Sequence, residues 1–164
     1  MPRPNELVIN TGPIIALVAA LGDLCVLQIY RRVWAPLEVC EEISAGGVAQ
    51  FAVAEFEAAH WLEKGRQPLS IAPVLLNTLD KGEAAVIQLA LDENVETVCM
   101  DEAAGRRMAR LYDLSVTGSI GVLLRARSEG YEFSMREAIA RMQAHGVWLS
   151  DRVIAFALAQ AGEA

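Results

Sequence analysis

The sequence contains few residues that could form a disulfide framework or a zinc site. It has three cysteines, Cys25, Cys40 and Cys99, and two histidines, His60 and His145. An odd number of cysteines without metal-ligand spacing argues against both kinds of site. Each cysteine has apolar neighbours, so we expect three reduced core residues. The two histidines are isolated in the chain and form no ligand cluster.

The chain also lacks a long hydrophobic run. The longest apolar stretch extends over 13–21 and ends at Gly22-Asp23, well short of the roughly 20 apolar residues of a bilayer span. A secretory signal is not expected, because Asn10-Thr11-Gly12-Pro13 interrupts the first apolar run and no positive cluster precedes it. We therefore expect a cytoplasmic protein without a membrane partner.

Positive charge is scarce overall. Fourteen Lys and Arg against twenty-one Asp and Glu give a net charge of -7, which excludes a strongly basic nucleic-acid-binding domain. Segment 103–136 is the exception, with six arginines and three carboxylates, so any contact with nucleic acid is expected to be local. The sequence has no G-x-G-x-x-G motif and no Walker loop, which gives a nucleotide cofactor little support.

The 164 residues are 54% hydrophobic, which excludes disorder and fits one domain over 1–164. Short β-branched runs predict strands at 7–9, 33–35, 95–100 and 114–116, with a weak extended stretch at 60–62 and a connection marked by Pro68 and Pro73. Helical patterns occupy 14–21, 23–30, 37–43, 48–59, 80–91, 103–112, 120–128, 134–144 and 150–161, and Gly46-Gly47 ends the third of these helices. Alternating strands and helices predict an α/β fold of three layers, a central parallel sheet flanked by helices. The helices after about residue 134 extend this domain.

Oxygen-bearing side chains follow the predicted strands or begin nearby helices. They are Asn10, Glu41, Glu42, Glu83 and Asp101. Functional groups of parallel sheets gather at the carboxyl ends of the strands, and Mg²⁺ prefers carboxylate and amide oxygens. Each residue also has a structural interpretation: Asn10 in a turn, Asp101 as a helix cap, Glu83 in a capping box with Asp80, and the Glu41-Glu42 pair on a solvated helix face.

Two further features could bind phosphate. Arg106 and Arg110 share one helical face with Arg107 beside them, and segment 117–121 places small residues at a helix start, where anions bind well. The alternatives are a surface helix whose arginines pair with carboxylates and an ordinary helix start.

The order of motifs resembles the PIN-domain family, in particular a prokaryotic branch similar to toxin nucleases. The resemblance runs through most of the chain. Five blocks carry it: 8–17, 39–43, 80–85, 101–107 and 116–124. It implies a PIN-like α/β fold, Mg²⁺- or Mn²⁺-dependent cleavage of RNA, and often a toxin role in a toxin-antitoxin pair.

Carried over by position, the resemblance makes Asn10, Glu42, Glu83 and Asp101 the metal-binding and catalytic residues. The first position departs from the family pattern, since Asn10 keeps an oxygen ligand but lacks the negative charge. We expect weaker ion binding and one ion rather than two. The residues expected to contact substrate or the water shell of the ion are Thr11, Arg106, Arg107 and Ser119.

The expected substrate is single-stranded RNA. The implied protein partners are an antitoxin and a second copy of the chain, because members of this family commonly form dimers. Two alternatives stay open. A catalytically weakened PIN domain would bind nucleic acid without cutting it, and an interaction protein would use its two C-terminal helices to bind an antitoxin or a second copy.

Overall fold

The computed structural model describes residues 3–46 and 50–164. Its five strands form one sheet in the order β3-β2-β1-β4-β5, and every neighbouring pair is parallel. They are β1 (Arg3–Ile9), β2 (Arg32–Ala35), β3 (Glu63–Lys64), β4 (Val95–Cys99) and β5 (Ser115–Thr117). The predicted central parallel sheet is confirmed.

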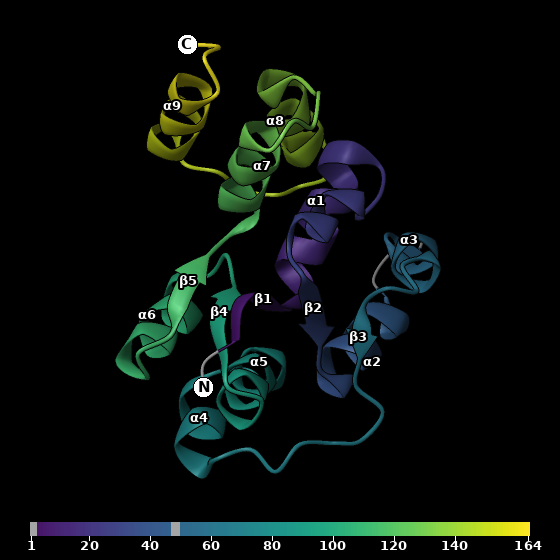
Figure 1. The fold of residues 1–164 in the computed structure, drawn as a ribbon, viewed down its shortest axis with the longest axis vertical. Coiled ribbons are helices and arrows are strands. Elements are labelled where there is room, and N and C mark those ends of the chain that lie inside the picture. Colours follow the sequence, from purple (N-terminus) through teal and green to yellow (C-terminus); the bar gives the residue numbers. More distant parts are fainter. Residues whose placement is uncertain (1–2, 47–49) are drawn as a thin grey trace.

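Helices cover both faces of this sheet. Figure 1 shows the strands between a layer with α1, α7 and α8 and a layer with α2 and α5. The helices are α1 (Thr11–Leu21), η1 (Cys25–Ile29, a 3₁₀ helix), α2 (Leu37–Ala45), α3 (Val53–Ala58), α4 (Pro73–Thr78), α5 (Lys81–Asp92), α6 (Ala103–Leu111), α7 (Ser119–Ser128), α8 (Met135–Ala144) and α9 (Asp151–Gln160). No helix within the described ranges has the length and apolar character needed to cross a membrane. The predicted three-layer α/β fold is confirmed.

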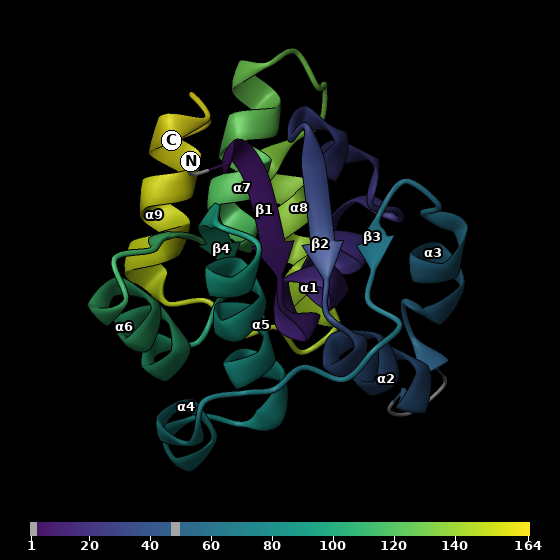
Figure 2. The ribbon, with the colours of Figure 1, turned by 60° about the horizontal axis from the view of Figure 1, so that its bottom comes forward.

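The core forms around β1, the middle strand. Leu7, Val8 and Ile9 are fully buried, because β1 has a strand on either side and helices on both faces. A strand in this position can be one continuous apolar run, as it is here. Behind β1 and β2, Figure 2 shows α1, α7 and α8, and α1 packs closely against α8.

The strand order reverses at β1. Chain connections lead from β1 to β2 and β3 on one side, and from β4 to β5 on the other. Ile9 pairs with Cys99, and Cys99 pairs with Thr117, so the three strands end at the same level. Open parallel sheets bind ligands at such a switch point, beyond the carboxyl ends of the strands.

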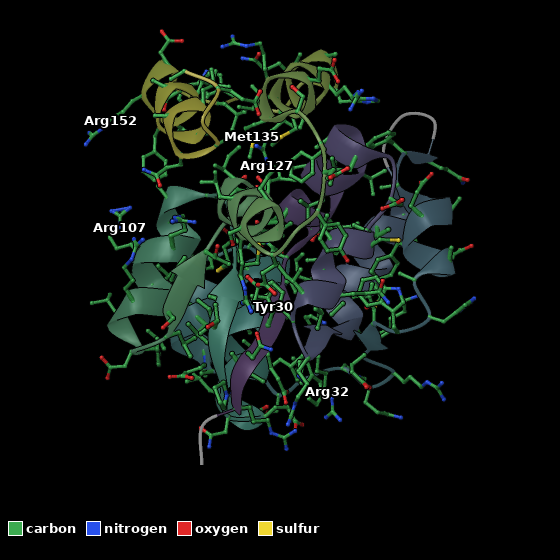
Figure 3. All side chains as sticks on the ribbon, turned by 45° about the horizontal axis from the view of Figure 1, so that its top comes forward. Tyr30, Arg32, Arg107, Arg127, Met135 and Arg152 are labelled. Carbon is green, nitrogen blue, oxygen red and sulfur yellow. The ribbon has the colours of Figure 1, made fainter. Side chains whose placement is uncertain are left out.

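The C-terminal end of the chain is fastened to the start of α8. The Glu163 carboxylate accepts hydrogen bonds from the backbone N–H groups of Met135 and Arg136, at 2.7 and 3.1 Å, and pairs with Arg127 at 2.7 Å. These donors hold the pKa of Glu163 at about 2. Figure 3 shows Arg127 next to Met135, the first residue of α8, and both donate to Glu163.

Several predicted boundaries are wrong. The extended stretch expected at 60–62 is replaced by strand β3 at Glu63–Lys64, and the connection expected at Pro73 is the start of α4. The helix expected over 23–30 is the short 3₁₀ helix η1, with Asp23 accepting a hydrogen bond from the backbone of Cys25. Helix α1 begins at Thr11 rather than Ile14, so Pro13 lies within its first turn.

The helix expected over 48–59 is confirmed only as α3, Val53–Ala58. Val48 and Ala49 lie outside the described residues, as does Gly47 of the expected Gly46-Gly47 break.

The three cysteines are all free. Cys99 is buried and Cys40 is partly buried, but Cys25 is exposed. The core position predicted for Cys25 is wrong, because η1 directs Val26 and Leu27 inward and leaves its first residue at the surface.

Candidate metal and phosphate site

Asn10 occupies the switch point at the end of β1. Its backbone N–H donates to the carbonyl of Cys99 at 3.1 Å, which continues the pairing of β1 with β4. Asn10 stands at the N-cap position of α1, yet its side chain makes no capping hydrogen bond. Its Oδ1 is buried and has no partner among the described residues. The helix-start and turn interpretations therefore leave this oxygen unexplained.

Two carboxylates converge with Asn10 around Gly82, in the first turn of α5. A Cβ atom at Gly82 would lie 2.5 Å from Glu42 Oε1, 3.4 Å from Asn10 Oδ1 and 3.6 Å from Asp80 Oδ1. Oxygens from the N-cap residues of α1 and α5 and from α2 thus surround one point where only a glycine fits. Desolvation and the negative charge of Asp80 raise the pKa of Glu42, as expected for carboxylates that share a site.

Glu83 forms the capping box with Asp80 that its spacing allowed. Asp80 Oδ1 accepts from the Glu83 backbone N–H at 2.8 Å, and Glu83 Oε1 accepts from the Asp80 N–H at 3.3 Å. The other oxygen, Oε2, is buried without a partner in the described structure and lies near Gly105. Burial and the contact with Asp80 raise the pKa of Glu83 to about 7. Glu83 stands behind the site rather than in its cavity.

Asp101 follows β4 and connects two elements of the site. Its Oδ1 accepts a hydrogen bond from the backbone N–H of Ser119, at the start of α7, at 2.8 Å. The N-cap position of α6 is taken by Glu102, so Asp101 does not cap that helix. This bond keeps the carboxylate of Asp101 at the sheet edge beside Gly118.

A cavity of about 680 Å³ gathers most of these groups. The polar side chains that line it are Asn10, Thr11, Glu42, Asp80, Asp101, Glu102 and His145. Of the four predicted metal ligands, Asn10, Glu42 and Asp101 are brought together here, and Glu83 does not line the cavity. Thr11 is buried, with its hydroxyl unpartnered in the described part of the chain.

An adjoining groove of about 500 Å³ carries the predicted phosphate-binding residues Arg106 and Ser119. Arg106 is fixed in place, because its Nη1 donates to the carbonyl of Met100 at 2.7 Å. Arg107 is exposed, and neither it nor Arg110 forms an ion pair with a described residue. Ser119 is only 1% exposed, and its backbone N–H donates to Asp101 Oδ1.

A family model described as a PIN domain matches residues 6–163. The chain belongs to the PIN-domain family. No curated protein and no solved structure matches it. The resemblance carried by the five sequence blocks is thereby confirmed, and a PIN domain indicates a nuclease-type fold.

The oxygen donors of this PIN domain suit one hard cation with a large share of water ligands. Among residues 3–46 and 50–164, no three His, Cys, Asp or Glu side chains are grouped closely enough to hold a metal ion alone. Mg²⁺ usually keeps several waters and takes one or two carboxylates from the protein. The unpartnered amide oxygen of Asn10 beside Glu42 and Asp80 fits that requirement.

Sequence reasoning missed three of the polar residues that line the cavity. Asp80 was expected only as a helix cap, although one carboxylate can cap a helix and still face a site. Glu102 directly follows Asp101, and its adjacency was the available signal. His145 comes from the segment after α8, and its distance along the chain from the other residues concealed it.

Proposed function

We propose that this PIN domain is a ribonuclease that uses Mg²⁺ or Mn²⁺ to hydrolyse phosphodiester bonds of RNA. One observation carries the proposal: Asn10 Oδ1 is buried and unpartnered in the described structure, at the switch point beside the carboxylates of Glu42 and Asp80. A buried acceptor without a partner costs about 1–3 kcal/mol, a cost that a bound cation removes. Family membership supports the same chemistry, because the PIN fold is of the nuclease type.

In this proposal Asn10, Glu42 and Asp80 hold the cation directly, and Asp101, which lines the same cavity, contacts it through a coordinated water. When bound, such an ion lowers the pKa of a coordinated water and offsets the charge that develops on the phosphate. Glu83 acts as a positioning residue, because its capping box fixes Asp80. Asp80 and Glu102 also supply negative charge to the cavity that the neutral Asn10 does not.

Arg106 and Arg107 bind the substrate in different ways. Arg106 lies close to Asp101 across Gly118 and is held by the Met100 carbonyl, so its guanidinium can clamp a phosphate at a fixed place. Arg107 is exposed and can follow the RNA backbone beside it. Both offset the repulsion between the acidic cavity and RNA.

The test is cleavage of a mixed pool of single-stranded RNA by the full chain with Mn²⁺, with Mg²⁺ and with EDTA. Asp101→Asn keeps an oxygen that can accept from Ser119 N–H but removes the charge, so we expect it to fold and to lose cleavage. Glu42→Gln should lose most cleavage as well. Glu41→Gln is the matched control, since Glu41 is an exposed neighbour on α2 outside the cavity.

Cleavage that requires the ion, Glu42 and Asp101, but not Glu41, would support the nuclease. Cleavage that persists in Asp101→Asn would overturn it. RNA binding in EDTA without cleavage under any ion would favour the alternative, a catalytically weakened PIN domain, for which the neutral Asn10 is the specific observation.

The proposal extends to a toxin that an antitoxin protein inhibits. A toxin of this kind stops growth when it is expressed alone and depends on its nuclease site. We expect growth arrest from the native chain and none from Asp101→Asn at equal protein level. Arrest by both proteins would contradict a nuclease toxin. Mass measurement by light scattering tests the proposed homodimer.

A further inference from the structure

Trp148 lies on the segment between α8 and α9 and is 83% exposed. A side chain of this size gains most of its stabilising effect from burial, which Trp148 does not have. It lines the acidic cavity together with Asn10 and Asp101, and it also lines the adjoining groove together with Arg106. The indole therefore stands at the junction between the proposed cleavage site and the groove.

The groove continues from Trp148 towards α9 with further apolar surface. Val153 and Phe156, both on α9, line it and are 38% and 55% exposed. Two aromatic rings are thus accessible along one hollow that begins at the carboxylate of Asp101. Its volume, about 500 Å³, is in the usual size range of ligand pockets.

Two helices that contribute residues to this groove, α6 and α9, also carry arginines. Arg106 lines the groove, Arg107 and Arg110 are exposed on α6, and Arg152 is exposed on α9. Figure 3 shows Arg107 and Arg152 projecting on the same side of the molecule. None of Arg107, Arg110 and Arg152 forms an ion pair within the described ranges, although the chain as a whole is acidic.

Exposed aromatic rings, together with unpaired arginines on the neighbouring helices, match the chemistry of a single nucleic-acid strand. Bases of a single strand are free to stack on aromatic side chains, while arginines bind the phosphates. Bases of a duplex are stacked on one another and could not reach Trp148. A protein partner could also use Trp and Arg, but the groove leads directly to Asp101 and Arg106, where the phosphate chemistry is proposed.

We propose that Trp148 stacks on a base of single-stranded RNA next to the cleaved phosphate, and that the groove towards Phe156 binds the adjoining nucleotide. This inference rests on the proposed ribonuclease function, because it takes the cavity beside Trp148 as the place of cleavage. It makes Trp148 a substrate-binding residue that determines how the strand lies.

The test is the affinity of the full chain for a fluorescein-labelled single-stranded oligoribonucleotide of mixed sequence, in EDTA so that it stays intact. Stacking of one base predicts that Trp148→Ala weakens binding about 5- to 150-fold. Trp148→Phe should restore most of the affinity. Leu111→Ala is the control, since Leu111 is 72% exposed on α6 and lines neither cavity. An abasic oligonucleotide should bind both the native chain and Trp148→Ala equally weakly.

Cleavage assays separate this inference from the ribonuclease proposal. If the native chain cleaves RNA, Trp148→Ala should raise KM far more than it lowers kcat. If Trp148→Ala cleaves and binds RNA as the native chain does, the base-stacking proposal is wrong and the ribonuclease proposal stands. If the native chain binds RNA but never cleaves it, and Trp148→Ala loses that binding, the result would support stacking and overturn the nuclease. If Trp148→Ala instead turns a dimer into a monomer with unaltered RNA affinity, Trp148 belongs to a protein interface and the inference is wrong.

Discussion

At the scale of single residues, Asn10 sets the charge at the switch point. Its neutral amide lies beside the carboxylates of Glu42 and Asp80, so Asn10 adds no third negative charge at this place. An aspartate there would repel both when no ion is present and would attract a cation more strongly. We therefore expect the same residue to control both the stability of the metal-free fold and the affinity of the proposed site for metal.

We expect Asn10→Asp to lower the unfolding free energy in EDTA by about 1–3 kcal/mol, because it buries a further negative charge beside Glu42 and Asp80 where the native chain has a neutral amide. The same variant should bind Mn²⁺ at least about tenfold more tightly, equivalent to about 1.4 kcal/mol. Denaturant unfolding and isothermal titration measure the two effects. If Asn10→Asp is less stable in EDTA but binds Mn²⁺ no more tightly, the cation does not bind beside residue 10.

Glu83 makes the stability of the fold depend on pH. Burial, then the hydrogen bond and charge of Asp80, raise its pKa from 4.5 to about 7. The folded chain thus favours the neutral carboxyl. Its stabilising contribution is complete below about pH 4.5 and is lost as pH rises through about 7. The difference between these two pKa values corresponds to about 3 kcal/mol at most.

Glu83→Gln stays neutral at every pH and keeps an oxygen for the Asp80 N–H. In EDTA, the native chain should therefore lose stability between pH 5 and pH 8 relative to this variant, by about 2–3 kcal/mol. Urea unfolding at several pH values measures the difference. If the two proteins change in parallel over this range, Glu83 does not hold its proton in the fold.

Single residues also show what the sequence allowed us to predict of the site. Asn10, Glu42 and Asp101 were found because they follow strands or match family positions, and the fold brings them into one cavity. Trp148 and His145 could not be found in that way. They reach the cavity because α8 packs against α1, a contact between segments far apart in the chain.

At the scale of elements, the first turn of α5 shapes the site through Gly82. Alanine is usually more stable than glycine within a helix, by roughly 0.5–1 kcal/mol. Here its Cβ would lie 2.5 Å from Glu42 Oε1, so the carboxylate would have to move away from Asn10. Local helix stability and the geometry of the site thus favour different residues at this position.

We expect Gly82→Ala to lower Mn²⁺ affinity and RNA cleavage at least about tenfold, while the helix content and the melting temperature in EDTA stay close to native. Gly12→Ala is a matched control in a first helical turn of the same site, because a Cβ there would meet nothing within 4 Å. Circular dichroism, ion titration and cleavage assays provide the readouts. Full activity in Gly82→Ala would show that Glu42 need not stay beside Asn10.

Helices and strands were predictable where a local sequence signal marks where the element begins or ends. The capping box of Asp80 and Glu83 fixes the start of α5, and the alternation of strands and helices predicts the parallel sheet. Strand β3 is different, because it is two residues long at the edge of the sheet and exists through its pairing with β2. Strand β1 similarly extends back to Arg3 because Arg3 pairs with Val95. No local pattern in the sequence contains these partners.

At the scale of the whole molecule, the net charge of -7 and the four carboxylates in one cavity lead us to expect a fold that divalent cations stabilise. Glu42, Asp80, Asp101 and Glu102 come from three separate parts of the chain that unfolding disperses. A cation that binds them only in the folded chain must stabilise the fold, by about 2.7 kcal/mol at a hundred times its Kd. General screening of the acidic surface acts through any salt and needs no particular residue.

These two effects can be separated by thermal unfolding. For a domain of this size, about 2.7 kcal/mol raises the melting temperature by about 5–10 °C. We expect such a rise with saturating MnCl₂ or MgCl₂ and a much smaller one with NaCl at equal ionic strength. Glu42→Gln should lose most of the divalent increment, whereas Glu41→Gln, which removes the same charge from the outer surface of α2, should keep it. Equal increments in both variants would mean that the ions screen the surface and that the cavity holds no specific cation.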